Sequence, residues 1–565
     1  MKKIKDVLLE YWGYKKFKDQ QEAIINSIIS GDNALVTLPT GGGKSLCYQL
    51  PSLIIGGTTI VISPLIALME DQVRALNKLG ISSFYFKSDS KNLTMDQQLD
   101  NCIYGNYNLV YCSPERLINS EFLNKISRAK VNHIAIDEAH CISEWGHDFR
   151  PSYRNIKDLI KLFPNAVVTA YTGSANLRVK NDIIENLELI NINKIESSYE
   201  RKNIFYEVSH VDNKINGLLK VINNESSIIY CDTRRSTEYV SKKLSHKGFS
   251  VDYFHGGIPI EEKKEKLLKW HSEDIKIIVA TTAFGMGIDK SNVRKVIHYD
   301  IPRSIENYYQ ESGRAGRDGE KSKAISLVTP EDKSSFINQN LNSLPNKTNL
   351  IETYKKLCNH LQIPFGEGQG NCFDFDFIFF CRKYELNKRT THSIFRFLEN
   401  NGLIVLNYTR NNKIKIHVQA SINTIKDSIK LSNPQSKVIE SLIRFYPSIM
   451  DKKIEISIEK LIQFTNLSRK EIYEYLKFYN KINLLDLDIT SSDIQLHWLK
   501  PREDNYSINP LIKQLEEINS IKKIKFKKII KLIYDDKNCK TRQLLKYFGE
   551  NKANNCMNCS SFCCK

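Results

Sequence analysis

The stretch that decides the fold of the first domain is NALVTLPTGGGKSLCYQLP, residues 33–51. Its apolar, β-branched first half predicts a strand, and the glycines that follow predict a tight turn before a helix. Three glycines allow the backbone N–H groups of that turn to face a phosphate: Gly41, Gly42 and Gly43. Lys44 can reach the β- and γ-phosphates of a nucleotide, and Ser45 opens the helix with a hydroxyl for Mg²⁺. The stretch therefore predicts a nucleotide-binding phosphate loop.

A second apolar strand that ends in two carboxylates supports this interpretation. The strict phosphate-loop pattern has a glycine where Leu38 stands, so the first motif alone is not decisive. About ninety residues downstream, HIAIDEAH (residues 133–140) places Asp137 to hold Mg²⁺ through water and Glu138 to orient or deprotonate the attacking water. Strands alternate with helical stretches through residues 30–330, which predicts parallel sheets of βαβ units.

An arginine segment, QESGRAGRDG (residues 310–319), completes the predicted nucleotide site. Arg314 and Arg317 are three residues apart, so both can point to one face of a helical turn. From a second domain they could stabilise charge on the transferring γ-phosphoryl group. The preceding residues 277–302 read as two strands joined by a glycine-containing loop, which predicts a second sheet.

Length and charge limit the class of protein. A chain of 565 residues is long enough for roughly three or four domains. No apolar run reaches the ~20 residues that span a bilayer, and the N-terminus lacks the features of a signal peptide, so we expect a cytosolic protein. A net charge of +18 suits a partner made of phosphates, although the many lysines also fit an AT-rich genome.

At this point the chain resembles the RecQ family of DNA helicases. The resemblance rests on motifs that occur in order over residues 11–319, among them YWGYKKFKDQQEAI, SPLIALMEDQV, CSPERL, IIYCDTRRSTE and the segments quoted above. It implies two RecA-like domains with ATP in the cleft between them, and 3′-to-5′ translocation on single-stranded DNA with unwinding of forked duplexes in repair and recombination. It also implies a bacterial, cytoplasmic, nucleoid-associated protein without a membrane partner.

The resemblance assigns roles to individual residues. It implies that adenine is contacted by Tyr14, Lys18 and Gln21, where Lys18 replaces the arginine usual in the family. It implies a nucleotide-binding set of Thr40, Gly41, Gly42, Gly43, Lys44 and Ser45, and a catalytic set of Lys44, Asp137, Glu138, Gln310, Arg314 and Arg317.

The residues after the second motif, CISEWGHDFRPSYRN (141–155), are called the aromatic loop below. In the family this loop meets single-stranded DNA, where bases stack on aromatic side chains and arginine adds charge. The resemblance implies that Trp145, Phe149 and Arg150 bind DNA. Because Asp137 and Glu138 lie only a few residues away, a loop that reorders on DNA would reposition these carboxylates.

The C-terminal third contains two segments with the same predicted plan of helix, turn, helix and hairpin. In the first, a helix over about 387–400 precedes LIVLNY and IKIHV, which alternate around the turn TRNNK as a hairpin. In the second, Ser468 and Glu471 form a capping box, and LLDLDI and IQLHWL form a hairpin around TSSD. Each plan predicts a winged helix, which binds duplex DNA or proteins. In the RecQ family, a hairpin of one such domain acts as a wedge that separates the strands of a duplex. Arg410, at the tip of the first hairpin, is a candidate contact of such a wedge, and the second unit could be a spacer.

The last segment, residues 538–565, predicts a structural zinc site. Cys556 and Cys559 have zinc-ligand spacing, and Cys539 lies upstream. LLKYFGE (544–550) resembles the zinc-binding subdomain of the family, here with the winged-helix units inserted before it. The fourth ligand is Cys563 or Cys564, and Cys563 is favoured because the shorter loop closes at lower entropy.

Together these features predict an α/β protein: two RecA-like parallel-sheet domains, then winged-helix-type α+β units and a small helical zinc-binding segment. The expected domains are 1–197 (ATP-binding), 198–340, 341–425, 426–505 and 506–565. The expected cofactors are ATP, Mg²⁺ and Zn²⁺, and the expected partners are single-stranded and forked duplex DNA. Two alternatives remain open: an RNA-unwinding ATPase of the D-E-A-H type, and a DNA-binding scaffold without catalysis.

Overall fold

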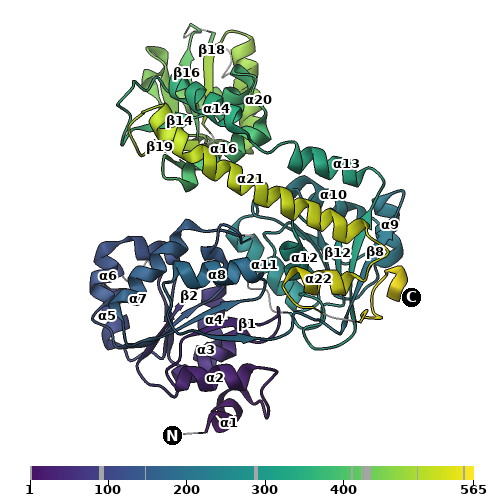
Figure 1. Cartoon of the computed structure of the whole chain (residues 1–565). Coiled ribbons are helices and arrows are strands. Elements are labelled where there is room, and N and C mark those ends of the chain that lie inside the picture. The colour runs from purple at the N-terminus through teal and green to yellow at the C-terminus, as the bar shows by residue number, and fades with distance from the viewer. Residues whose placement is uncertain are drawn as a thin grey trace. The chain divides into compact units, whose positions relative to one another are not determined.

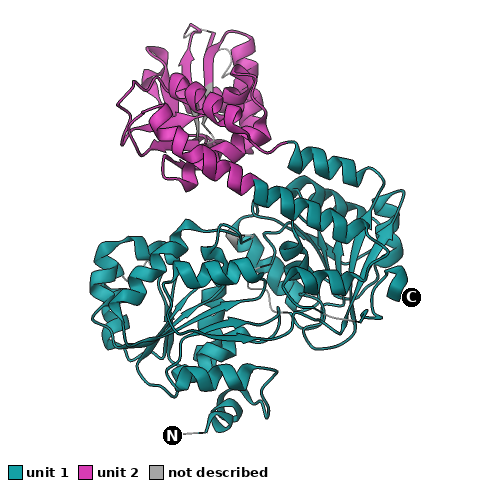
Figure 2. Ribbon diagram, in the orientation of Figure 1, with its two compact units in different colours: residues 1–342, 520–565 teal, residues 343–519 magenta. Residues whose placement is uncertain are grey.

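The computed structural model of the chain describes residues 3–87, 94–146, 148–285, 290–408, 411–421, 424–425, 434–492, 494–551 and 554–564. The chain divides into two compact units (Figure 2). Unit 1 comprises residues 1–342 and 520–565, and unit 2 comprises residues 343–519. The candidate wedge residue Arg410 lies outside the described residues.

The first part of unit 1 is a parallel sheet covered by helices (Figure 1). Its strand order is β3-β4-β2-β5-β6-β1-β7, and every pairing is parallel. The strands are β1 (Ala34–Thr37), β2 (Thr58–Ile62), β3 (Ser83–Tyr85), β4 (Leu109–Cys112), β5 (Val131–Ile136), β6 (Val167–Thr172) and β7 (Asn193–Glu196). The inner strands β1, β2 and β5 are almost wholly buried because helices cover both faces of the sheet, whereas the edge strand β7 is polar and mostly exposed.

The helices of this first part are α1 (Ile4–Val7), α2 (Gln21–Ile29), α3 (Lys44–Ser52), α4 (Ile66–Lys78), α5 (Met95–Tyr104), α6 (Ser120–Ile126), α7 (Ile156–Leu162) and α8 (Leu177–Asn186). Short π- or 3₁₀-helical turns cover Leu8–Trp12, Pro114–Ile118, Ala139–Ile142 and Pro151–Asn155.

The second part of unit 1 is another parallel sheet, of order β10-β11-β9-β12-β13-β8. Its strands are β8 (Ile204–His210), β9 (Ser227–Tyr230), β10 (Val251–Phe254), β11 (Ile277–Ala280), β12 (Lys295–His298) and β13 (Ser322–Val328). Its helices are α9 (Lys214–Val221), α10 (Arg234–Ser245), α11 (Ile260–His271), α12 (Ile305–Ser312) and α13 (Asp332–Phe336), which continues as a π-helical turn (Ile337–Leu341). The two parallel α/β sheets predicted from the motifs are thus confirmed.

The C-terminal segment packs onto the edge strand of this second sheet. It consists of the end of α21 (Asn505–Tyr534), α22 (Lys540–Tyr547) and a 3₁₀ turn (Phe562–Cys564). Cys559 forms a parallel bridge with Tyr206 of β8, and Ser560 N donates to Tyr206 O over 2.9 Å. Residues from α21 and α22 join the hydrophobic core of the second sheet, so unit 2 interrupts a chain that returns to the same core.

Unit 2 contains two small sheets, and neither is built from the hairpins predicted above. Its strands are β14 (Cys372–Phe375), β15 (Ile404–Asn407), β16 (Asn411–Val418), β17 (Ile454–Ile456), β18 (Leu485–Ser492) and β19 (Ile494–Trp498). Its helices are α14 (Lys347–His360), α15 (Phe377–Lys383), α16 (Lys388–Asn400), α18 (Pro434–Phe445), α19 (Ile458–Thr465) and α20 (Arg469–Lys481), with a 3₁₀ turn at Pro447–Met450.

The predicted hairpins were wrong because the strands exchange partners. β15 pairs with β19 and β16 pairs with β18, so each predicted hairpin contributes one strand to each sheet. The second helical unit is therefore an insertion between β15 and β19 of the first, and the expected division at residue 425 does not separate the two sheets. The capping box of Ser468 and Glu471 at the start of α20 is confirmed.

Candidate functional site

The phosphate loop (residues 38–45) connects the buried strand β1 to the first turn of α3. Gly41 and Gly43 have φ angles of +81° and +74°, a region that favours glycine because other residues are strained there. Gly43 is the N-cap of α3, so the N–H groups of the first helical turn, which have no partner within the helix, lie together at the phosphate loop. Such a helix start is suited to an anion such as a phosphate.

The two predicted carboxylates lie at the same edge of the sheet as the phosphate loop. The Lys44 ammonium is 3.6 Å from a carboxylate oxygen of Glu138. Asp137 is buried, and its carboxylate accepts a hydrogen bond from Glu138 N over 2.9 Å. Burial and the neighbouring charge of Glu138 raise the pKa of Asp137 to about 6. A buried carboxylate of this kind fits a divalent cation, whose charge would favour its ionised form.

A chain of hydrogen bonds links the segment that follows Asp137 and Glu138 to the second sheet domain. His140 Nδ1 is 3.1 Å from the hydroxyl of Thr172, and Ser174 N donates to the same hydroxyl over 3.3 Å. The Gln310 amide then donates to the Ser174 hydroxyl over 2.9 Å. Burial lowers the pKa of His140 to about 3, so the ring is neutral in this chain. The path joins the strand end that carries Glu138 to helix α12.

The two arginines of the arginine segment make different contacts. The Arg317 side chain packs against the phosphate loop so closely that a Cβ atom at Gly41 would lie 3.2 Å from its Cγ atom. The guanidinium of Arg314 instead donates to the carbonyl of Gly285, in the loop after β11. Helix α12 ends at Ser312, before either arginine, and the expectation that both arginines share one face stays a prediction.

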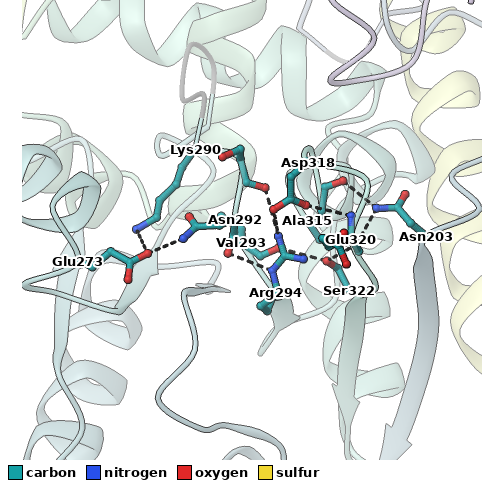
Figure 3. Close-up of polar contacts among 12 residues, drawn as sticks. Asn203, Glu273, Lys290, Asn292, Val293, Arg294, Ala315, Asp318, Glu320 and Ser322 are labelled. Carbon is teal, nitrogen blue, oxygen red and sulfur yellow. Dashed lines mark hydrogen bonds and ion pairs between the residues drawn. The ribbon is translucent and has the colours of Figure 1, made fainter. Parts of the chain in front are cut away.

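Polar contacts hold the arginine segment from its other side (Figure 3). The Asn203 amide donates to the carbonyl of Gly316 over 2.7 Å, and Arg294 forms an ion pair with Asp318. These contacts fix the backbone on both sides of Arg317.

Arg201 is a site residue that the sequence reasoning missed. One terminal nitrogen of its guanidinium donates to the carbonyls of Thr40 (2.8 Å) and Gly313 (2.9 Å). The other donates to the carbonyls of Ala315 (3.0 Å) and Gly316 (3.1 Å). Arg201 thus ties the phosphate loop to the arginine segment. No sequence signal marks it, because it lies in a polar stretch between two strands.

Gly313 lies against Thr40 of the phosphate loop and gives a first prediction. A Cβ atom at this position would lie 1.9 Å from the Thr40 hydroxyl oxygen and 2.9 Å from the Tyr309 carbonyl oxygen. Gly313→Ala must therefore push the arginine segment away from the phosphate loop, and we expect the rate of ATP hydrolysis to fall at least about tenfold. Gly256→Ala is the control, because its nearest atom is 3.9 Å away. Hydrolysis within twofold of the wild-type rate in Gly313→Ala would contradict this geometry.

The residues expected to contact adenine are distributed unevenly. Gln21 is buried, and its amide nitrogen donates to the carbonyls of Gly42 (3.3 Å) and Gly43 (3.2 Å). Tyr14 and Lys18 are exposed. The structure thus brings Gln21 to the phosphate loop and leaves the other two side chains facing solvent.

The aromatic loop is held by contacts on both sides. The guanidinium of Arg178, from α8, lies over the ring of half-buried Trp145. The Arg154 guanidinium lies 5.1 Å from the centre of the Phe149 ring. Arg150 donates to the carbonyl of Pro64 over 2.8 Å and pairs with Asp148, which favours a role in holding the loop over a direct contact with a phosphate.

Four cysteine thiols come together in the C-terminal segment. Cys539, Cys556, Cys559 and Cys564 have sulfur atoms that all lie within 4.8 Å of one another. The separations include 3.3 Å for Cys539–Cys556, 3.9 Å for Cys539–Cys559 and 3.8 Å for Cys556–Cys564. Zinc–sulfur bonds of about 2.3 Å in a tetrahedron place the sulfurs about 3.8 Å apart, so this cysteine cluster fits zinc.

The structure favours Cys564 over Cys563, the residue favoured by loop length, as the fourth member of this set. Cys563 and Cys564 are neighbours in one 3₁₀ turn, and the Cys563 sulfur lies 3.8 Å from that of Cys564, but only one of the two belongs to the group of four sulfurs. That residue is Cys564, which is buried. The entropy argument carries little weight, because one residue of loop length changes the closure free energy by only about 0.2 kcal/mol.

Comparison with known proteins matches four parts of the chain to family models. Residues 18–181 match the DEAD/DEAH box helicase model, and residues 211–319 match the helicase conserved C-terminal domain. Residues 416–489 match the RecQ helicase winged-helix domain of Bacteroidota, and residues 502–564 match the RecQ zinc-binding model. The chain belongs to the RecQ helicase family. The matched models and the cysteine cluster support ATP and zinc as ligands of this family member.

Named relatives agree with this membership. The chain is 43% identical over 330 residues to the ATP-dependent DNA helicase RecQ of Haemophilus influenzae, covering 58% of this chain and 53% of that one. It is 42% identical over 331 residues to the RecQ of Bacillus subtilis, covering 58% and 56%. A mimivirus protein named as a putative ATP-dependent RNA helicase is 40% identical over 366 residues, covering 63% and 66%.

The chain spans about half the length of the two bacterial relatives. Among solved structures, the DUF1998 helicase MrfA bound to DNA has a TM-score of 0.51 at 17% identity, covering 72% of this chain and 58% of that chain. At this identity the likeness concerns the fold alone.

Proposed function

We propose that the chain is an ATP-dependent 3′-to-5′ DNA helicase of RecQ type, which couples ATP hydrolysis to translocation on single-stranded DNA and to duplex unwinding in repair and recombination. The observation that carries the proposal is the meeting of the two sheet domains at the phosphate loop. Arg201 and Gly313 contact Thr40 there, and Arg317 packs on Gly41. Domains that meet at a nucleotide can convert its hydrolysis into relative movement.

In this proposal each side chain has a role that its position supports. Lys44 binds the β- and γ-phosphates, and Thr40 and the loop glycines hold them through the backbone. Glu138 orients the attacking water, and Arg317 supplies positive charge from the second domain. Gln310 couples helix α12 of the second domain to the nucleotide site through hydrogen bonds that run by way of Ser174 and Thr172. We assign Arg314 the role of holding the loop after β11 through its hydrogen bond to the Gly285 carbonyl.

We also propose that Ser45 and Asp137 hold Mg²⁺. The burial of the Asp137 carboxylate, which raises its pKa to about 6, supports this assignment. When bound, the ion would neutralise charge on the phosphate oxygens of ATP.

For the structural zinc we propose the ligands Cys539, Cys556, Cys559 and Cys564. Their thiols are brought close by three backbone N–H groups that donate to sulfur: Arg542 N and Cys556 N to Cys539, and Asn558 N to Cys556, over 3.3 to 3.4 Å. Zinc bound by four thiolates closes its coordination sphere and serves the fold instead of catalysis.

The proposal also assigns domains and location. Residues 1–197 would form the ATP-binding motor domain, and 198–340 the second motor domain. Residues 343–519 would bind duplex DNA, and the segment after them would bind zinc. None of the helices in the described part of the chain has the length and apolar character needed to cross a bilayer. We propose action in the bacterial cytoplasm, at the nucleoid.

The experiment that tests the function is phosphate release from ATP with and without nucleic acid. We expect single-stranded DNA to stimulate release at least about tenfold and RNA of the same sequence to stimulate it far less. The RNA arm is needed because one relative carries the name of a putative RNA helicase. Stimulation by RNA equal to that by DNA would reassign the substrate, and no stimulation by either would leave only a binding scaffold.

The aromatic loop gives a further prediction. If a DNA base replaces Arg178 on the Trp145 ring, Trp145→Ala should weaken single-stranded DNA binding by the ~1–3 kcal/mol of one stacked base. The rate of ATP hydrolysis at saturating DNA should fall at least about fivefold, because the loop no longer reports DNA to Asp137 and Glu138. Leu177→Ala is the control, because Leu177 is exposed and lines the same cavity as Trp145. Full stimulation of Trp145→Ala at saturating DNA would reduce the loop to a binding surface.

A further inference from the structure

Lys525 lies in α21 and reaches the aromatic loop from the C-terminal segment. Its ammonium donates to the backbone carbonyls of Trp145 (2.6 Å) and Gly146 (2.8 Å). It also lies 3.3 Å from a carboxylate oxygen of Glu306. An ammonium has three donors, and these three partners account for all of them.

Glu306 connects this contact to two further elements. It lies on α12, and its side chain is only 1% exposed, compared with 13% for that of Lys525. The hydroxyl of Tyr547, from α22, donates to the same Glu306 oxygen over 2.6 Å. We call Lys525, its two carbonyl partners and Glu306 the latch. The aromatic loop, α12, α21 and α22 all meet there.

Both arms of the nucleotide site are directly connected to the latch. The aromatic loop follows Asp137 and Glu138, and the Tyr153 hydroxyl within it donates to the Asp137 carbonyl over 3.0 Å. On α12, Gln310 is four residues after Glu306 and therefore on the same helix face. A change at Lys525 can thus affect Asp137 and Glu138 through the aromatic loop. It can also affect the hydrogen bond between Gln310 and Ser174 through α12.

A cavity beside the latch gives the loop room to move. Its volume is about 420 Å³, and its lining includes Trp145, Arg178, Lys528 and Tyr547. The loop is therefore held at its backbone by Lys525, while its largest side chain borders open space.

We propose that Lys525 is a positioning residue that holds the aromatic loop in its DNA-free arrangement. The inference rests on the proposed function, because it assumes that DNA rearranges this loop. A ligand shifts a conformational equilibrium only by its difference in affinity for the two states. DNA that moves the loop must first break the bonds of the latch, so the latch keeps ATP hydrolysis low until DNA binds.

The test replaces Lys525 by methionine, which keeps an unbranched side chain and removes the ammonium. Without DNA, the rate of ATP hydrolysis should rise at least about fivefold, the lower end of typical coupling between sites. The rate at saturating single-stranded DNA should stay within about twofold of wild type, and half-maximal stimulation should need less DNA. Lys525→Arg keeps charge and donors, so its rate without DNA should return toward the wild-type rate.

The matched control is Lys528→Met. This variant loses the same charge from the same helix, but Lys528 lies over the Tyr547 ring at 4.8 Å and makes no bond to the aromatic loop among the contacts of the described residues. Its rate without DNA should equal that of wild type. An equal rise in Lys525→Met and Lys528→Met would mean that only positive charge near the loop matters, and it would overturn the latch.

Other outcomes decide between the latch and simpler accounts. A rate without DNA that is unchanged in Lys525→Met, or rates with and without DNA that fall in parallel, would overturn the proposal. If thermal melting shows that this variant is unfolded, Glu306→Gln decides. This second variant should raise the rate without DNA in the same direction, and an unchanged rate would contradict the latch. If the wild-type chain shows no stimulation by DNA, the proposed function fails first.

Discussion

Replacing Lys44 by alanine is expected to lower the rate of ATP hydrolysis at least about a hundredfold and to abolish unwinding. Lys44 is the one cation in the phosphate loop itself, and its ammonium lies 3.6 Å from Glu138. Its loss removes charge from the place where the β- and γ-phosphates bind. Phosphate release and strand displacement measure the two effects.

Binding of single-stranded DNA by Lys44→Ala should remain close to wild type. The aromatic loop is held by Arg178, Pro64 and Lys525, and none of these contacts involves Lys44. Lys78→Ala, at the exposed end of α4, is the control for loss of a lysine. Unwinding that survives in Lys44→Ala would remove the motor assignment altogether.

The second large effect concerns zinc. We expect purified protein to hold one zinc ion and Cys564→Ala to lose it, whereas Cys563→Ala should retain it. A structural zinc site contributes on the order of 10 kcal/mol of binding free energy, so the fold of the segment should be lost with the metal. Zinc content by elemental analysis and the rate of proteolysis after α22 measure these effects.

Cys563→Ala is a matched control for Cys564→Ala, because the two residues are neighbours in one turn. Cys556→Ser should behave like Cys564→Ala, since both thiols belong to the cysteine cluster. Zinc retained in Cys564→Ala and lost in Cys563→Ala would restore the ligand set favoured by sequence spacing. Zinc retained in both variants would mean that neither cysteine is required.

The zinc segment also bears on regulation. Lys525 of the latch lies on α21, and Tyr547, which donates to Glu306 of the latch, lies on α22. The cysteine cluster begins at Cys539, between those two helices. Loss of zinc is therefore expected to loosen the latch as well as the local fold. In this account the structural zinc also affects the rate of ATP hydrolysis in the absence of DNA.

The motor domains could be predicted from the sequence because their signals are local. The buried strands β1 and β5 are rich in apolar residues and end directly at the phosphate loop and at Asp137. Both the element and the functional residue are then read from about ten consecutive residues. The same holds for the capping box at Ser468, which needs only four residues.

The pairing of strands in unit 2 could not be predicted in the same way. β15 and β16 alternate as hairpin strands should, and only three residues separate them. Their partners, β19 and β18, lie about 70 to 90 residues downstream, and local alternation gives the face of a strand but not its partner. An insertion between two strands leaves no trace in their own sequence.

Single basic residues were missed for a related reason. The chain has 82 lysines and arginines, so neither Arg201 nor Lys525 stands out by type or spacing. Their importance lies in backbone carbonyls that they reach across the fold, and a carbonyl is present at every residue. Only the three-dimensional arrangement distinguishes them from lysines and arginines in solvent.

Strand displacement on tailed duplexes tests the central claim most directly. The chain should displace a labelled strand from a DNA duplex with a 3′ single-stranded tail in the presence of ATP and Mg²⁺. It should displace little from the same duplex with a 5′ tail, and Lys44→Ala should displace neither. Hydrolysis of ATP without displacement from the 3′-tailed duplex, or equal displacement from both duplexes, would contradict a 3′-to-5′ DNA helicase.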